Sequence, residues 1–145
     1  AGEPLWSCPR CGKRFVGRNM WHSCSRHTVD EFFAGRDPAL RRLFEAYVAF
    51  VERIGPFSID VAKTRISFQA RVRFAGVVRL RRDGLVAGFW LKRRIESPRF
   101  TRVEHIPPSN WIYQFLIRAP EDLDDEARTW LEEAYRVGLQ LRESK

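Results

Sequence analysis

The feature that most constrains the fold of this chain is a strict alternation of apolar and polar side chains over residues 65–74. The apolar positions are Ile66, Phe68, Ala70, Val72 and Phe74, and the polar ones are Arg65, Ser67, Gln69, Arg71 and Arg73. Successive side chains of a strand point to opposite faces of its sheet. The pattern therefore predicts a strand with one buried face and one arginine-rich solvent face.

Turn signals extend this strand into an antiparallel sheet. Ala75-Gly76 suggests a bulge that shifts the phase before residues 78–81 continue the alternation. Asp83-Gly84 is a two-residue hairpin signal, and Pro107-Pro108 separates two later strands. We expect a five-stranded, mainly antiparallel sheet with strands near 65–74, 78–81, 85–91, 99–106 and 111–118.

Helix signals lie on both sides of this sheet region. Thr28 and Glu31 have capping-box spacing before a short helix through Phe33, and Asp37-Pro38 begins a second helix that Gly55-Pro56 ends. A third helix is predicted over about 123–141, behind a cluster of acidic residues suited to its N-terminal end. If both long helices pack on one sheet face, the domain is α+β and the arginine face stays open.

The first 27 residues hold all three cysteines and two of the three histidines. Cys8 and Cys11 have the spacing of a zinc-binding turn, and thiolate and imidazole are preferred zinc ligands. The second ligand pair is His22 with Cys24 or, from spacing alone, Cys24 with His27. We expect a small structural zinc knuckle over residues 1–27, followed by an α+β sheet domain over residues 28–145.

The charge distribution points to a polyanionic partner. The net charge is +8, and residues 63–102 contain 12 Lys or Arg against two acidic residues. A basic sheet face with aromatic residues can pair with phosphates and stack on bases. The candidate nucleic-acid contacts are Lys63, Arg65, Arg71, Arg73, Arg79, Arg81, Trp90, Lys92 and Arg93. The alternative is a protein- or small-ligand-binding module that recognises an acidic partner.

Catalytic signatures are absent from the sequence. There is no phosphate-binding loop, no nucleophile elbow and no HExxH motif. Lys63 and His105 are the only candidate catalytic residues, and both are weak candidates, so an enzymatic role is not favoured. No run of about 18 apolar residues occurs and no signal pattern opens the chain, so we expect a cytoplasmic protein.

Several segments together resemble a known bacterial family, domain of unknown function 5655. They are Cys8-Pro9-Arg10-Cys11-Gly12, Trp21-His22-Ser23-Cys24, Lys63-Thr64-Arg65-Ile66-Ser67-Phe68, Phe89-Trp90-Leu91, Ser97-Pro98-Arg99-Phe100 and Trp130-Leu131-Glu132-Glu133-Ala134-Tyr135. The resemblance implies an α+β sheet domain and no established activity. Its H-x-C pattern falls on His22 and Cys24, which implies zinc ligands Cys8, Cys11, His22 and Cys24. Ser25 stands where the family often has Gly.

Overall fold

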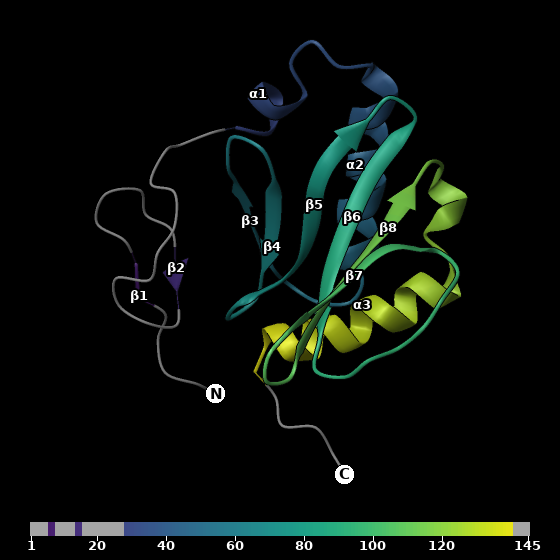
Figure 1. The fold of residues 1–145 in the computed structure, drawn as a ribbon. Helices are drawn as coiled ribbons and strands as arrows, with labels where there is room; N and C mark the ends of the chain where they lie inside the picture. The colour runs from purple at the N-terminus through teal and green to yellow at the C-terminus, as the bar shows by residue number, and fades with distance from the viewer. Residues whose placement is uncertain (1–5, 8–13, 16–27, 141–145) are drawn as a thin grey trace.

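The computed structural model describes residues 6–7, 14–15 and 28–140. Its main body is a six-stranded antiparallel sheet in the order β3-β4-β5-β6-β8-β7, with three α-helices (Figure 1). The strands are β3 Ser58–Val61, β4 Ile66–Gln69, β5 Arg73–Arg81, β6 Gly84–Leu91, β7 Phe100–Ile106 and β8 Asn110–Ile117. The α+β class is confirmed, whereas the predicted count of five strands is wrong.

The helices are α1 Val29–Phe33, α2 Pro38–Glu52 and α3 Asp125–Gly138, and a short 3-10 helix, Pro120–Asp122, precedes α3. Each α-helix begins at a side-chain cap. Thr28 Oγ1 accepts from the backbone N–H of Glu31 at 3.1 Å, and Asp37 Oδ1 accepts from Ala39 at 2.9 Å. Asp124 Oδ1 accepts from the N–H of Ala127 at 3.1 Å. These bonds satisfy N–H groups that have no partner inside the helix.

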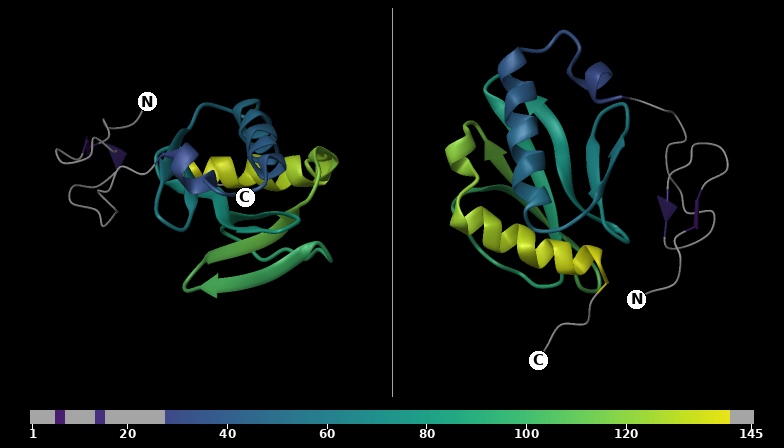
Figure 2. Two further views of the ribbon diagram at one scale, coloured as in Figure 1. Left: turned by 90° about the horizontal axis from the view of Figure 1, so that it is seen from above. Right: turned by 180° about the vertical axis from the view of Figure 1, so that it is seen from behind.

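Both long helices cover the same face of the sheet, and Figure 2 shows α2 and α3 on one side of the strands. The core lies between these two layers. The ring of Phe89 on β6 stacks between Tyr113 on β8, at 5.2 Å between centroids, and Trp130 on α3, at 5.6 Å. The opposite face of the sheet carries no helix among the described residues, and we call it the open face.

The long alternating segment forms two strands instead of one. The chain leaves the sheet at residues 70–72, where the backbone N–H groups of Arg71 and Val72 both donate to the carbonyl of Gly138 at 2.9 Å. This break lies before the predicted bulge at Ala75-Gly76. It arises because the end of α3, distant in sequence, offers these N–H groups a partner outside the sheet.

Two register shifts accompany the break. One lies in the β4–β5 pairing at Phe68/Gln69, and the other lies in the β5–β6 pairing between Val77 and Arg79. A register shift of one residue reverses the face that each following side chain occupies. The two shifts offset each other, so Arg73 and Arg79 both lie on the open face.

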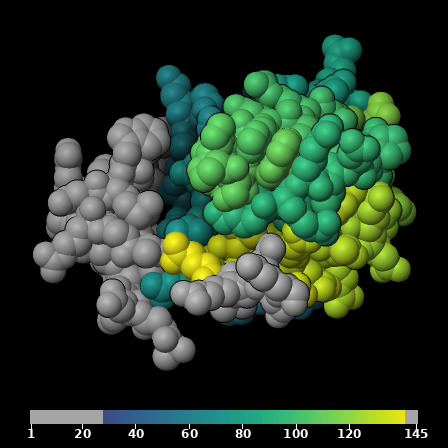
Figure 3. All heavy atoms as spheres, turned by 60° about the horizontal axis from the view of Figure 1, so that its bottom comes forward, coloured from purple at the N-terminus to yellow at the C-terminus, as the bar shows by residue number. Residues whose placement is uncertain are grey.

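The loop between β6 and β7 runs along α3 and is visible beside it in Figures 1 and 3. Arg93 pairs with Glu133 of α3 at 2.8 Å, and Arg99 pairs with Asp124 at 2.9 Å. Part of the positive charge predicted from the sequence is therefore neutralised at α3. Among the described residues, no helix is long and apolar enough to cross a membrane.

Candidate functional site

One row of residues crosses the open face from edge to edge. The strand registers place its members directly opposite one another on adjacent strands. In sheet order the row is Asp60, Ser67, Gly76, Gly88, Gln114 and Arg102. Its two central positions are glycines, so the middle of the open face lacks side chains.

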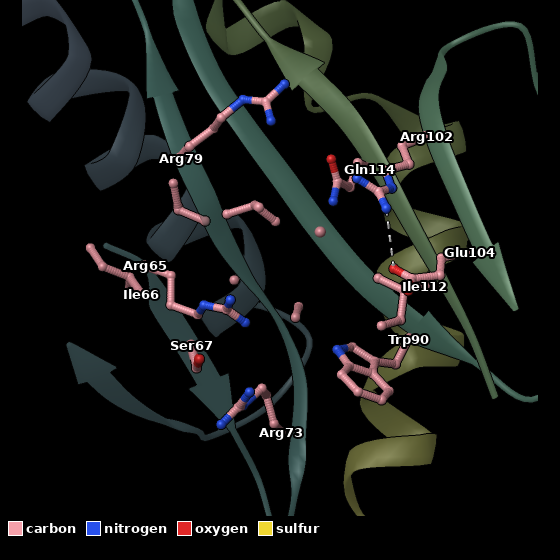
Figure 4. Close-up of a pocket in the computed structure, with 15 residues that line it drawn as sticks. Arg65, Ile66, Ser67, Arg73, Arg79, Trp90, Arg102, Glu104, Ile112 and Gln114 are labelled. Carbon is pink, nitrogen blue, oxygen red and sulfur yellow. Dashed lines mark ion pairs between the residues drawn. The ribbon is translucent and has the colours of Figure 1, made fainter. Parts of the chain in front are cut away.

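The two glycines form the floor of a concave site with a volume of about 290 Å³ (Figure 4). A Cβ on Gly76 would collide with the backbone carbonyl of Ile66, so this position needs glycine for strand packing. A Cβ on Gly88 would lie 3.0 Å from Val78 Cγ2 and would take space from the site. We call this site the basic hollow. It is lined chiefly by Arg65, Ser67, Arg73, Gly76, Arg79, Gly88, Trp90, Arg102, Glu104, Ile112 and Gln114.

Three of the arginines around the basic hollow have no ion pair within the part of the chain that the structure describes. Among the described residues, no acidic side chain lies within ion-pair distance of Arg65, Arg73 or Arg79. Arg102 contacts Glu104 at 4.0 Å, the longest ion pair of the described chain. The rim therefore carries uncompensated positive charge, which favours an anionic ligand.

Arg73 is partly buried and lies near the charge of Arg65. Partial burial of its guanidinium lowers the pKa of Arg73, and repulsion from Arg65 lowers it further. Asp60 on β3 acts in the opposite direction but does not restore the ordinary pKa. An arginine stays protonated at neutral pH. The repulsion between the Arg65 and Arg73 guanidinium groups therefore costs free energy unless an anion binds between them.

Ser67 adds a hydroxyl to the same side of the basic hollow. Its residue is 5% exposed, and its side chain makes no hydrogen bond within the described chain. Ser67 Oγ does not belong to the buried side-chain atoms of the described chain that lack a partner, so it reaches solvent and can donate to an oxygen atom of a ligand in the basic hollow.

The other side of the basic hollow combines an aromatic and apolar part, Trp90 and Ile112, with polar side chains of β7 and β8. Trp90 on β6 is half-buried and lies opposite Ile112 on β8. Figure 4 shows the indole of Trp90 at the edge of the basic hollow, on the side away from Arg79. A partly exposed indole beside guanidinium groups can stack on a flat aromatic ligand.

The structure brings four of the nine predicted nucleic-acid contacts together in the basic hollow, namely Arg65, Arg73, Arg79 and Trp90. The other five lie elsewhere. Lys63 is exposed in the β3–β4 turn, and Arg71 lies in the break before β5. Arg81 pairs with Asp83 at 3.5 Å, Lys92 donates to Asn110 Oδ1 at 2.6 Å, and Arg93 pairs with Glu133.

Sequence reasoning missed the β7–β8 side of the basic hollow. Arg102, Glu104, Ile112 and Gln114 line it, although their strands were predicted close to their observed positions. The alternation of Ile112, Gln114 and Leu116 with buried residues of β8 shows which of its residues face outward. The sequence does not contain the strand order that places β8 beside β6.

The two weak candidates for catalytic residues, Lys63 and His105, are far apart. Lys63 lies in the turn at the β3–β4 edge of the sheet, whereas His105 lies on β7 at the opposite edge. His105 stacks on Trp111 with 4.1 Å between ring centroids, and its Nε2 lies 3.3 Å from the carbonyl oxygen of Pro108. Lys63 and His105 therefore do not form one site.

The predicted zinc ligands Cys8, Cys11, His22 and Cys24, and the alternative His27, lie outside the described residues. The described chain contains no group of three or more His, Cys, Asp or Glu side chains arranged to hold a metal. Close to these positions, β1 Trp6–Ser7 pairs antiparallel with β2 Arg14–Phe15. The two strands flank Cys8 and Cys11 in sequence.

The comparisons with known proteins define a family. Domain of unknown function (DUF5655) matches residues 29–138. The chain belongs to this family. The matched segment contains all six strands of the main sheet and every residue of the basic hollow. Neither a curated protein nor a solved structure matches the chain.

Proposed function

We propose that this DUF5655 domain binds single-stranded nucleic acid across the open face of its sheet, with the basic hollow at the centre. The observation that carries this proposal is the convergence of Arg65, Arg73 and Arg79, none with an ion pair in the described chain, with Trp90 around a glycine floor. Guanidinium groups pair with phosphates, and an indole stacks on unpaired bases.

A single strand suits the geometry better than a duplex. The bases of a duplex are stacked inside it, whereas the rings of a single strand are free to contact Trp90. Arg79 and Arg102 lie on either side of the glycine floor, so phosphates that flank a central nucleotide can also find partners (Figure 4).

We further propose that residues 1–27 bind one zinc ion in a structural role. The supporting observation is the antiparallel pairing of Trp6 with Phe15 and of Ser7 with Arg14. Cys8 and Cys11 lie between these two strands in sequence, and two cysteines separated by two residues have the spacing of a zinc-binding turn. A site closed by four protein ligands stabilises the fold and has no open position for catalysis.

Fluorescence anisotropy with labelled single-stranded DNA and RNA tests the nucleic-acid proposal. If Arg65, Arg73, Arg79 and Arg102 neutralise up to four phosphates, the logarithm of the affinity should fall against the logarithm of salt concentration with a slope of about −2 to −3. A duplex of the same sequence should bind more weakly. No binding at low salt, or binding insensitive to salt, would contradict the proposal.

Charge reversal locates the interface. The exposed pair Arg65→Glu and Arg79→Glu should abolish strand binding without unfolding the protein. The matched control is Arg53→Glu with Arg136→Glu, which changes the net charge equally but alters helix α3 and the end of α2. Equal loss in both variants would show that net charge alone attracts the strand. We would then favour the alternative, in which the open face binds an acidic protein.

A further inference from the structure

One corner of the basic hollow gathers three hydrogen-bond donors. Figure 4 shows the hydroxyl of Ser67 between the side chains of Arg65 and Arg73. Ser67 is 5% exposed and has no side-chain hydrogen bond in the described chain, and neither arginine has an ion pair there. Two guanidinium groups and a hydroxyl offer more donors than a carboxylate has oxygen atoms. They match the several acceptor oxygens of a phosphate.

The opposite wall of the basic hollow differs in chemistry. Trp90 and Ile112 supply an aromatic and an apolar surface, Glu104 lies beside Ile112, and Gln114 lies farther along the wall beside Arg102 (Figure 4). The floor between the two walls is Gly76 and Gly88, with the side chain of Val78 next to Gly88. The basic hollow thus has a charged end and an aromatic end within one volume.

We propose that the basic hollow is a binding site for one nucleoside phosphate unit, with its phosphate against Arg65, Ser67 and Arg73 and its base stacked on Trp90. This inference rests on the proposed function, because a nucleic-acid strand contains such units, but a free mononucleotide has the same chemistry. The volume of about 290 Å³ lies at the lower end of ligand pockets, which span roughly 300–1,000 Å³. That size suits one nucleotide unit.

Isothermal titration calorimetry of the full chain at low salt tests this inference with four probes. They are AMP, adenosine, inorganic phosphate and a single-stranded oligodeoxythymidine. We expect AMP to bind more tightly than inorganic phosphate and adenosine to bind weakest, because only AMP contacts both ends of the basic hollow. Equal binding of AMP and inorganic phosphate would overturn the role of Trp90.

Variants separate the two ends. Arg73→Gln should weaken AMP by about tenfold or more, and Ser67→Ala by about three- to tenfold, since each loses a hydrogen bond to a charged group. Trp90→Leu should weaken AMP by about tenfold but leave inorganic phosphate unchanged. Arg136→Gln on α3 is the control with the same charge change as Arg73→Gln and should keep wild-type affinity. If Arg73→Gln unfolds the protein, the exposed Arg65→Gln takes its place as the variant of the phosphate end.

The outcomes distinguish this inference from the proposed function. If AMP and the strand both bind and both weaken in Arg73→Gln, the two proposals stand together. If AMP binds and the strand does not, the nucleotide site stands and the nucleic-acid proposal fails. If the strand binds with the expected salt slope while AMP and inorganic phosphate do not bind, the nucleotide site is overturned. AMP binding that Ser67→Ala, Arg73→Gln and Trp90→Leu all leave unchanged would also overturn it.

Discussion

Gly138, the last residue of α3, lies directly against Phe74 of β5. A Cβ on Gly138 would lie 2.8 Å from both Cβ and Cδ1 of Phe74. Because Phe74 is fully buried and Cβ is fixed to the backbone, neither group can rotate away. Overpacking should cost about 1–3 kcal/mol, and the higher helix propensity of alanine offsets about 1 kcal/mol of this. We therefore expect Gly138→Ala to lower the free energy of unfolding by a net amount of up to about 2 kcal/mol.

Urea denaturation measures this difference. Arg136→Ala is the control, since it makes an exposed alanine in the same helical turn and should change stability by no more than about 0.5 kcal/mol. A Gly138→Ala protein as stable as wild type would mean that the end of α3 can shift away from Phe74 at little cost.

Local sequence signals predicted part of the fold, and contacts between residues distant in sequence decided the rest. The caps at Thr28 and Asp37, the stripe of α2 and the hairpin at Asp83-Gly84 are local signals, and the structure has these elements close to their predicted positions. The division of residues 65–74 into two strands depends on the carbonyl of Gly138, about 66 residues away in sequence. Strand β3 was missed because its four residues, Ser58–Val61, are too few to show a periodic pattern.

The candidate site was likewise predictable only where it depends on local sequence pattern. Alternation over residues 65–74 and 78–81 predicted that Arg65, Arg71, Arg73, Arg79 and Arg81 share a face, and the structure places Arg65, Arg73 and Arg79 around the basic hollow but not Arg71 or Arg81. Arg93 and Arg99, which pair with α3 instead, belong to the same basic stretch of the sequence, residues 63–102. Only tertiary packing separates an arginine that faces a ligand site from one that is neutralised by a helix.

Arg99 joins the β6–β7 loop to the start of α3. Its Nη1 donates to Asp124 at 2.9 Å and to Glu126 at 3.1 Å, and its Nη2 donates to the carbonyl of Asp122 at 2.6 Å. Its guanidinium also lies 5.1 Å from the ring centroid of Trp130. We expect Arg99→Ala to lower the free energy of unfolding by about 2 kcal/mol, because several charge-assisted bonds are lost together.

Arg99→Lys should recover no more than half of that loss, since an ammonium group cannot reach all of these acceptors at once. Thermal and urea unfolding measure both variants. Arg128→Ala, which removes an exposed pair with Glu132, is the control and should cost only about 0.3–0.5 kcal/mol. If Arg99→Ala and Arg128→Ala were equally mild, the network around Arg99 would contribute no more than a surface pair.

Asp124 makes stability depend on pH. Desolvation acts to raise the pKa of Asp124, but the N–H of Ala127 and the guanidinium of Arg99 together outweigh it and hold that pKa below its ordinary value. A carboxyl group whose folded pKa is lowered stabilises the fold above the unfolded pKa of about 3.9 and loses this contribution as pH falls through the folded pKa. Asp124→Asn should therefore be less stable than wild type at neutral pH and should approach it in acid.

Urea unfolding at a series of pH values from neutral to strongly acidic conditions measures this convergence. Asparagine is also a good N-cap, so the comparison isolates the charge. Asp125→Asn removes a neighbouring carboxylate that makes no side-chain hydrogen bond in the described chain, and it controls for the helix dipole. A stability difference between Asp124→Asn and wild type that stays constant across pH would contradict the role assigned to the Asp124 charge.

The zinc proposal is tested by the metal content of the protein, because each ligand removed from a four-ligand site should release the ion. Native mass spectrometry of protein expressed with zinc should show one zinc per chain, and Cys8→Ser or Cys11→Ser should lose it. His22→Ala should lose zinc while His27→Ala keeps it, and the reverse result would transfer the fourth ligand to His27. His105→Ala, which alters the histidine stacked on Trp111, is the control and should retain the metal. Wild-type protein without zinc would contradict the proposal, and the pairing of β1 with β2 would then need another source of stability.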